Sequence, residues 1–175
     1  NFSKGQDEYT VNICLIERGY PIFGIIGHPP SKRYWYGFKG SKYNNLKEIT
    51  KHSTFVEKPK YIISKSLDVS TKKFISLIDS PSLVHCSSSL KFCKVADLEA
   101  NIYPRLQSIK KWDIAAGHAI LKSIGGSVID ITGKEFNYAS LTEYTESFFA
   151  ISNIKYWDHN IKKTLKKLDD YLQPD

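Results

Sequence analysis

The interpretation of this chain starts from one stretch, Lys111-Trp112-Asp113-Ile114-Ala115-Ala116-Gly117-His118-Ala119-Ile120-Leu121, which is followed by Gly125-Gly126. Apolar or small residues recur at helical spacing in and just after it, at Ile114, Gly117, Leu121 and Ile124. This spacing predicts a helix with one face packed inward, and Gly125 stands where a left-handed residue ends a helix.

Asp113 lies immediately before that pattern and admits two interpretations. As a capping residue, its carboxylate accepts hydrogen bonds from the free amides of the first helical turn. Alternatively, Ala115, Ala116 and Gly117 leave the first turn nearly bare, so that a phosphate or a metal ion can approach, with Asp113 as an oxygen ligand for Mg²⁺. The stretch by itself favours capping, so the rest of the chain must decide.

Length and composition predict a folded chain with one substantial core or two small ones, since 41% of the 175 residues are apolar and 13% are aromatic. No apolar run is long enough to span a bilayer and the start of the chain lacks a signal-peptide core, so we expect a cytoplasmic protein without membrane contact.

The 3 cysteines lack metal-binding spacing, and we expect reduced thiols. Because the chain contains no methionine, we expect it to be a portion of a longer protein.

The net charge of +7 favours acidic partners, and both phosphorylated small molecules and nucleic acids fit that sign. Part of the excess lies in Lys162-Lys163-Thr164-Leu165-Lys166-Lys167, where a helical apolar stripe leaves the lysines outside. Since these lysines are not interleaved with aromatic residues, we expect no nucleic-acid binding.

Up to about residue 55 the pattern favours an antiparallel meander, beginning with a buried strand at Tyr9–Ile16 that forms a hairpin with Ile22–Gly27. The polar stretch Lys51–Pro59 is the predicted linker. Strand and helix patterns alternate after it, which favours a parallel or mixed sheet. The sequence therefore predicts an α/β (α+β) fold with two domains, 1–55 and 56–175.

Short polar runs follow three of the predicted strands: Ser64-Lys65-Ser66, Ser87-Ser88-Ser89 with Lys91, and Tyr103-Pro104-Arg105. Each run taken singly is more typical of helix caps or surface ion pairs. Together they favour a phosphate site, because the carboxyl ends of parallel strands meet at one edge of a sheet.

Four motifs carry a resemblance to a known family: Glu8-Tyr9-Thr10-Val11-Asn12-Ile13, Ser88-Ser89-Leu90-Lys91-Phe92-Cys93, Tyr103-Pro104-Arg105 and Trp112-Asp113-Ile114-Ala115-Ala116-Gly117-His118-Ala119. In this order and spacing they resemble the inositol monophosphatase superfamily, in particular its CysQ-type 3'(2'),5'-bisphosphate nucleotidases. The resemblance runs from about Phe2 to Tyr138.

The resemblance implies a layered αβαβα sandwich and Mg²⁺-dependent removal of the 3'-phosphate of adenosine 3',5'-bisphosphate. It implies that Asp113 is a metal ligand beside the substrate, and that Ser88, Lys91 and Arg105 bind the nucleotide's phosphate and sugar. An arginine fork and a lysine point charge suit a doubly phosphorylated ligand.

The sequence also departs from the family pattern. The Asp-Pro-x-Asp-Gly-Thr motif, expected immediately before Asn1, is absent, as is an earlier helix with a metal-binding glutamate. Leu67 replaces a histidine, Ser87 replaces a glycine, and Leu106–Ile109 replaces Phe-Gly-Pro-Thr; Lys110 and Lys111 would then supply compensating charge near the ligand. We therefore expect the chain to be inactive alone.

Three alternatives remain open: an inositol or sugar monophosphatase of the same superfamily, a degenerate module that binds a phosphorylated ligand without hydrolysing it, and, least favoured, a nucleic-acid-binding protein. We also expect exposed apolar surface where the absent part of the fold would pack. Dimerisation through that surface is a further expectation.

Overall fold

The first part of the chain forms an antiparallel meander in this computed structural model, which describes residues 7–38, 41–44, 47–48 and 53–172. We call this five-stranded sheet, with order β1-β2-β3-β4-β5, sheet A. Its strands are β1 (Val11–Glu17), β2 (Tyr20–His28), β3 (Arg33–Phe38), β4 (Ser41–Asn44) and β5 (Lys47–Glu48). The predicted hairpin is confirmed, since β1 and β2 pair antiparallel. Residues 51–52 of the predicted linker lie outside the described residues, and 53–59 form no helix or strand.

The second five-stranded sheet, sheet B, has the order β7-β6-β8-β10-β9. β6 (Lys60–Ile63) pairs parallel with β7 (Ser82–His85) and β8 (Ile102–Arg105). β10 (Phe148–Ile151) runs antiparallel to β8 and to β9 (Ser127–Asp130). The connecting helices are α1 (Val69–Ser76), α2 (Leu90–Ala96), α3 (Ala115–Lys122) and α4 (Lys162–Leu172), with short turns at η2 (Pro29–Ser31), η3 (Lys111–Asp113) and η4 (Trp157–Ile161). The predicted alternation of strand and helix and the mixed sheet are confirmed.

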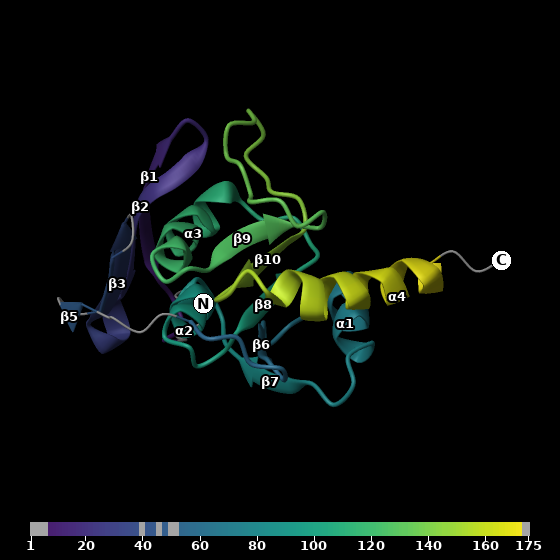
Figure 1. Cartoon of the computed structure of the whole chain (residues 1–175). Helices are drawn as coiled ribbons and strands as arrows, with labels where there is room; N and C mark the ends of the chain where they lie inside the picture. Colours follow the sequence, from purple (N-terminus) through teal and green to yellow (C-terminus); the bar gives the residue numbers. More distant parts are fainter. Residues whose placement is uncertain (1–6, 39–40, 45–46, 49–52, 173–175) are drawn as a thin grey trace.

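Strands β6, β8, β9 and β10 of sheet B are buried on both faces, whereas the edge strand β7 is largely exposed. Successive side chains along a strand point to opposite faces, so each buried strand contributes to two hydrophobic clusters. Ile62, Tyr103 and Phe148 belong to the hydrophobic cluster shared with α2 and α3. Their neighbours along the strands, Ile63 and Phe149, belong to a second cluster with side chains of α1 and of the segment before α4. Figure 1 shows α3 on one side of this sheet and α1 and α4 on the other.

Helix α3 lies between the two sheets and contacts sheet A along β2 and β3. Glycine permits this close approach: a Cβ on Gly24 would lie 2.4 Å from the Ala116 carbonyl oxygen, and one on Gly37 would lie 2.9 Å from the Ile120 Cα. The predicted helix and its stop are confirmed, and Gly125 has a φ of +84°.

The small residues at the start of α3 serve packing, which corrects the expectation that they leave room for a ligand. Ala115 and Ala116 are 4% and 2% exposed. A Cβ on Gly117 would lie 2.2 Å from the Phe92 ring. The space beside these small residues is therefore occupied by neighbouring parts of the protein.

The sequence predicts that the first strand of sheet A is buried, but in the structure the outer face of this strand is exposed. Val11, Ile13 and Leu15 of β1 are 57%, 61% and 56% exposed. The apolar and β-branched residues correctly predict a strand here, but none of the described elements covers its outer face.

The described residues thus form a mixed α/β sandwich in which sheet A, the α2–α3 layer, sheet B and the α1–α4 layer follow one another. The proposed boundary between residues 55 and 56 stays a prediction, and Ile26 and Trp35 of sheet A share one hydrophobic cluster with the second segment. Among the described residues, no helix combines the length and the apolar character needed to cross a bilayer.

Candidate functional site

A cavity of about 220 Å³ lies where β7 and β8 end, beside the start of α2 and η3. Its lining includes all four predicted site residues: Ser88, Lys91, Arg105 and Asp113. We call it the edge pocket. The parallel pairing of β6 with β7 and β8 explains the convergence, because the carboxyl ends of these strands share one edge of sheet B.

Ser88 and Ser89 are fixed by polar side chains from the start of sheet A. The Ser88 hydroxyl lies 2.7 Å from that of Thr10, and Ser88 has a left-handed φ of 57°. Asn12 Nδ2 donates to Ser89 Oγ at 2.9 Å, and Ser89 Oγ donates to the Asp113 carbonyl at 3.1 Å. One serine therefore links β1, α2 and the segment that carries Asp113.

Sequence reasoning did not assign a site role to Thr10 or Asn12, whereas Ser89 belonged to one of the polar runs predicted to meet at a phosphate site. The available signal was the alternation of two polar residues, Thr10 and Asn12, in an otherwise apolar strand pattern. Both side chains face inward and contact Ser88 and Ser89. The polar positions in the strand pattern therefore mark the side of β1 that meets the pocket wall.

Lys91 is buried, with 5% of its surface exposed. Its ammonium donates to the Ser88 carbonyl at 2.9 Å and lies 5.0 Å from the centre of the Tyr103 ring. Burial lowers the pKa of Lys91 to about 8. A desolvated ammonium is a strong partner for an anion, because water competes poorly for it.

Arg105 and Asp113 form the charged rim of the edge pocket. Arg105 donates from Nε to the Gln107 carbonyl at 3.2 Å, which orients its guanidinium. The Asp113 side chain does not cap α3, since the residue at the cap is Ile114 and no side-chain capping bond forms there. Desolvation by the pocket walls raises the pKa of the Asp113 carboxyl, and Arg105 and Lys91 partly offset that rise.

Among the described residues that line the edge pocket, one carries a carboxylate that can bind a metal ion, namely Asp113. Within the described part of the chain, no group of three or more His, Cys, Asp or Glu side chains is placed to hold a metal. Mg²⁺ takes an octahedral shell of oxygen ligands. The described residues therefore do not form a complete magnesium site by themselves.

The remaining sequence candidates lie elsewhere. Lys65 pairs with Glu8 at 3.0 Å and does not line the edge pocket. Lys110 and Lys111 do not supply charge there, which corrects that expectation: Lys110 Nζ lies 2.5 Å from Glu143 Oε2, and Lys111 Nζ donates to the Ser140 carbonyl at 2.6 Å. Both lysines hold the loop after β9 against the segment before α3.

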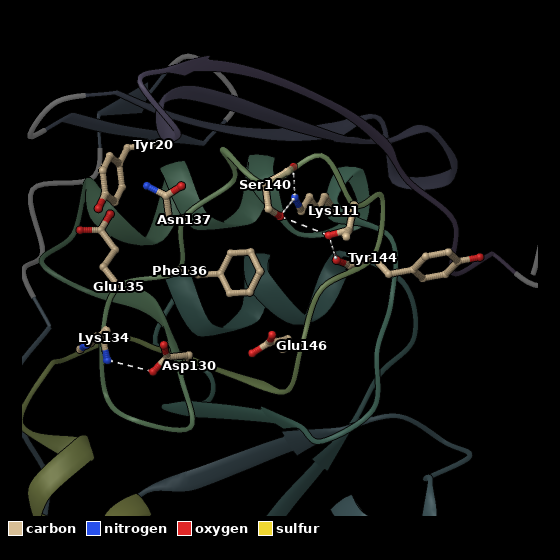
Figure 2. Close-up of a pocket in the computed structure, with 11 residues that line it drawn as sticks. Tyr20, Lys111, Asp130, Lys134, Glu135, Phe136, Asn137, Ser140, Tyr144 and Glu146 are labelled. Atoms are coloured by element: carbon tan, nitrogen blue, oxygen red, sulfur yellow. Dashed lines mark hydrogen bonds between the residues drawn. The ribbon is translucent and has the colours of Figure 1, made fainter.

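A larger cavity, of about 690 Å³, opens on the other side of that loop. Figure 2 shows its lining, with Lys111 turned toward Ser140 on one side of the Phe136 ring and Lys134 beside Asp130 on the other. Its charges are mixed and Lys111 is already engaged, so size alone does not make it the better candidate.

Fold and site together define a class: a layered α/β protein with a cationic pocket at the carboxyl edge of its mixed sheet. The model of the inositol monophosphatase family matches residues 1–170, and the chain belongs to this family.

Curated relatives include the 3'(2'),5'-bisphosphate nucleotidase CysQ of Buchnera aphidicola, 40% identical over 144 residues that span 79% of this chain and 54% of the relative. The CysQ protein of Salmonella typhimurium is 32% identical over 154 residues, or 86% of this chain and 63% of the relative. The chain thus spans between about half and two thirds of the length of these relatives.

Solved structures agree on the fold. CysQ from Bacteroides thetaiotaomicron superposes with a TM-score of 0.76 at 25% identity, covering 87% of this chain and 66% of that one. An inositol monophosphatase from Thermotoga maritima gives 0.79 at 23% identity, covering 99% and 66%. The predicted fold class is confirmed.

Proposed function

We propose that this chain is the substrate-binding portion of a magnesium-dependent 3'(2'),5'-bisphosphate nucleotidase, which removes the 3'-phosphate of adenosine 3',5'-bisphosphate. One observation carries the proposal: Ser88, Lys91, Arg105 and Asp113, from separate turns and elements, line one pocket. The relatives named as bisphosphate nucleotidases support the choice of reaction.

Within this proposal, each residue has a task that its surroundings favour. Lys91 supplies a desolvated positive charge fixed by the Ser88 carbonyl, and Arg105 offers a planar fork to a phosphate or sugar oxygen. The Ser88 hydroxyl, held by Thr10, supplies a short polar contact. Together these groups bind and orient an anion at the rim where Asp113 stands.

Asp113 contributes one ligand to Mg²⁺ in this proposal, and the other carboxylates come from outside the described residues. The raised pKa of Asp113 fits a carboxylate whose charge is incompletely balanced by its neighbours. A bound divalent cation would remove that imbalance.

The reaction is tested with a chimera in which this chain replaces the matched 144-residue portion of the Buchnera relative. We expect the chimera to release phosphate from adenosine 3',5'-bisphosphate in Mg²⁺ at least tenfold faster than from inositol 1-phosphate. Asp113→Asn should abolish the release while the fold, followed by circular dichroism, is kept. Faster release from inositol 1-phosphate, or full activity of the variant, would contradict the proposal.

The second candidate is a module that binds a phosphorylated ligand without hydrolysing it. It is favoured by the single carboxylate in the edge pocket. This candidate gives a chimera that binds adenosine 3',5'-bisphosphate, with Lys91→Met weakening the binding, but releases no phosphate.

A further inference from the structure

One wall of the edge pocket comes from the part of the chain that joins Arg105 to Asp113. Arg105 ends β8, Asp113 ends η3, and Ile109 between them also lines the pocket. Residues 106–110, which we call the connecting segment, form no helix or strand. Because buried or partly buried amides and carbonyls need partners, other parts of the protein have to supply the hydrogen bonds that fix the path of this segment.

Thr145, in the loop after β9, binds the connecting segment at its middle. The Thr145 hydroxyl accepts a hydrogen bond from the Ile109 amide at 3.2 Å, and the Thr145 amide donates to the Ile109 carbonyl at 2.8 Å. Next to this pair, Lys110 and Tyr144 form an antiparallel bridge. Thr145 therefore pairs with Ile109 much as a strand residue would, with its side-chain hydroxyl in place of a backbone carbonyl.

Burial distinguishes the Thr145 contact from its neighbours. Thr145 is 4% exposed. In the adjacent Lys110–Glu143 ion pair the two side chains are 28% and 63% exposed, and ion pairs at the surface contribute little to stability. An apolar side chain at position 145 would instead leave the Ile109 amide without its partner away from water, which is costly. The hydroxyl of Thr145 is therefore the contact on which the middle of the segment depends.

The ends of this wall are held separately. The Leu106 amide donates to the buried hydroxyl of Thr71 at 2.9 Å, and Ser89 Oγ donates to the Asp113 carbonyl at 3.1 Å. Ile109 lies between these two anchors and packs against the hydrophobic cluster of α2 and α3. A displacement at Ile109 thus changes the lining of the edge pocket directly.

We propose that Thr145 is a positioning residue of the edge pocket, whose hydroxyl fixes the connecting segment so that Ile109 and the residues at its two ends face one ligand. Thr145 does not itself line the pocket and acts through Ile109. The choice of an adenosine bisphosphate as that ligand rests on the proposed function.

The first test is calorimetric titration of the chain and three variants with adenosine 3',5'-bisphosphate. Thr145→Val keeps the shape of the side chain but removes the hydroxyl, and should weaken binding about tenfold because the Ile109 amide loses its partner. Thr145→Ser keeps the hydroxyl and should recover most of the affinity. Thr164→Val is the matched control: Thr164 is 7% exposed and its hydroxyl donates to the Asn160 carbonyl at 2.9 Å, so its loss should leave binding unchanged.

Hydrogen exchange of the chain without ligand gives a second measurement that does not depend on the nucleotide. Thr145→Val should speed exchange at the amides of Ile109 and Lys111, the second of which donates to the Glu143 carbonyl at 2.9 Å. The amides of β10 should stay protected. Similar urea midpoints for Thr145→Val and Thr164→Val would show that the two variants differ in the pocket wall and not in overall stability.

Several results would overturn the inference. When the parent binds the nucleotide, these are unchanged affinity or unchanged exchange in Thr145→Val, equal weakening in Thr164→Val, and failure of Thr145→Ser to recover binding. If the parent does not bind the nucleotide, the proposed function fails and the exchange rates decide the inference alone. Faster exchange confined to Ile109 and Lys111 would then support the positioning role, and unchanged exchange would contradict it.

Discussion

Both sheets of this protein contain strongly apolar strands, such as β2 in sheet A and β10 in sheet B, but the two sheets are covered differently. Sheet B is packed on both faces, with Phe148 on one and Phe149 on the other, each fully buried. Sheet A is packed on α3 through Gly24 and Gly37, while the apolar side chains on the other face of β1 are exposed. An apolar strand pattern thus reports that a face is built for burial, and the covering layer must be found in the structure.

The difference extends to function. The carboxyl edge of sheet B holds the edge pocket, whereas sheet A supports that pocket through Thr10 and Asn12 at the start of β1. The same strand therefore turns its polar side chains to the site and its apolar ones outward.

The largest expected effect contrasts Phe149→Ala in sheet B with Ile13→Ala on the exposed face of sheet A. Phe149 is fully buried, so its truncation should lower the free energy of unfolding by about 3–5 kcal/mol. Ile13 is 61% exposed, and its truncation should change it by about 0.5 kcal/mol or less. Urea denaturation of the chain measures both changes, and equal losses of stability would show that the outer face of sheet A is already covered.

A second pair contrasts the two faces of β2. Gly24→Ala places a Cβ 2.4 Å from the Ala116 backbone and should cost about 1–3 kcal/mol as α3 is forced away. Gly27→Ala meets nothing within 4 Å and should stabilise the chain by about 0.5 kcal/mol through lower backbone entropy in the unfolded state. Thermal unfolding of the two variants gives the comparison, and a neutral Gly24→Ala would argue against close packing of α3 on sheet A.

The edge pocket predicts a pH dependence of ligand binding. Burial lowers the pKa of Lys91 to about 8, and a bound phosphate favours the protonated form. Affinity for adenosine 3',5'-bisphosphate should therefore fall as pH rises through 8, by about tenfold between pH 7 and pH 9 if the ligand restores the ordinary lysine pKa. Calorimetry across this range tests the slope. Lys91→Arg, which stays charged, should abolish the slope, and a slope that persists in this variant would assign it to another group.

The smallest effect concerns the helix that covers the far face of sheet B. Asp68 caps α1 by accepting hydrogen bonds from the amide and the hydroxyl of Thr71, at 2.8 and 2.6 Å. Asp68→Ala should cost about 1 kcal/mol. Asp68→Asn, which keeps a capping oxygen, should recover most of this loss in the same denaturation experiment. Full stability of the alanine variant would show that the cap is not needed to hold α1 on sheet B.

Periodicity and turn residues were sufficient to predict the meander, the alternating strands and helices, and the helix after Asp113. These signals are local, since they depend on side-chain spacing within one element. The carboxyl-edge rule also predicts that Ser88, Lys91 and Arg105 meet, because parallel strands leave few places where their ends can lie. They line one pocket with Asp113, whereas Lys65, which the same rule placed there, pairs with Glu8 outside it.

The sequence did not predict the features that depend on contacts between distant parts of the chain. The small residues after Asp113 suggested open space, but Phe92 and β2 fill it, and only the packed structure shows this. Lys110 and Lys111 looked available to a ligand, whereas residues about thirty positions later bind them. Likewise, the burial of β1 depends on a layer that none of the described elements supplies.

Calorimetric titration of the chain with adenosine 3',5'-bisphosphate at pH 7 tests the central claim most directly, namely that the edge pocket binds a phosphorylated nucleotide. The account predicts saturable binding at one site, weakened at least tenfold by Lys91→Met and unchanged by Lys72→Met on the exposed side of α1. Absence of saturable binding, or equal affinity in all three proteins, would contradict it.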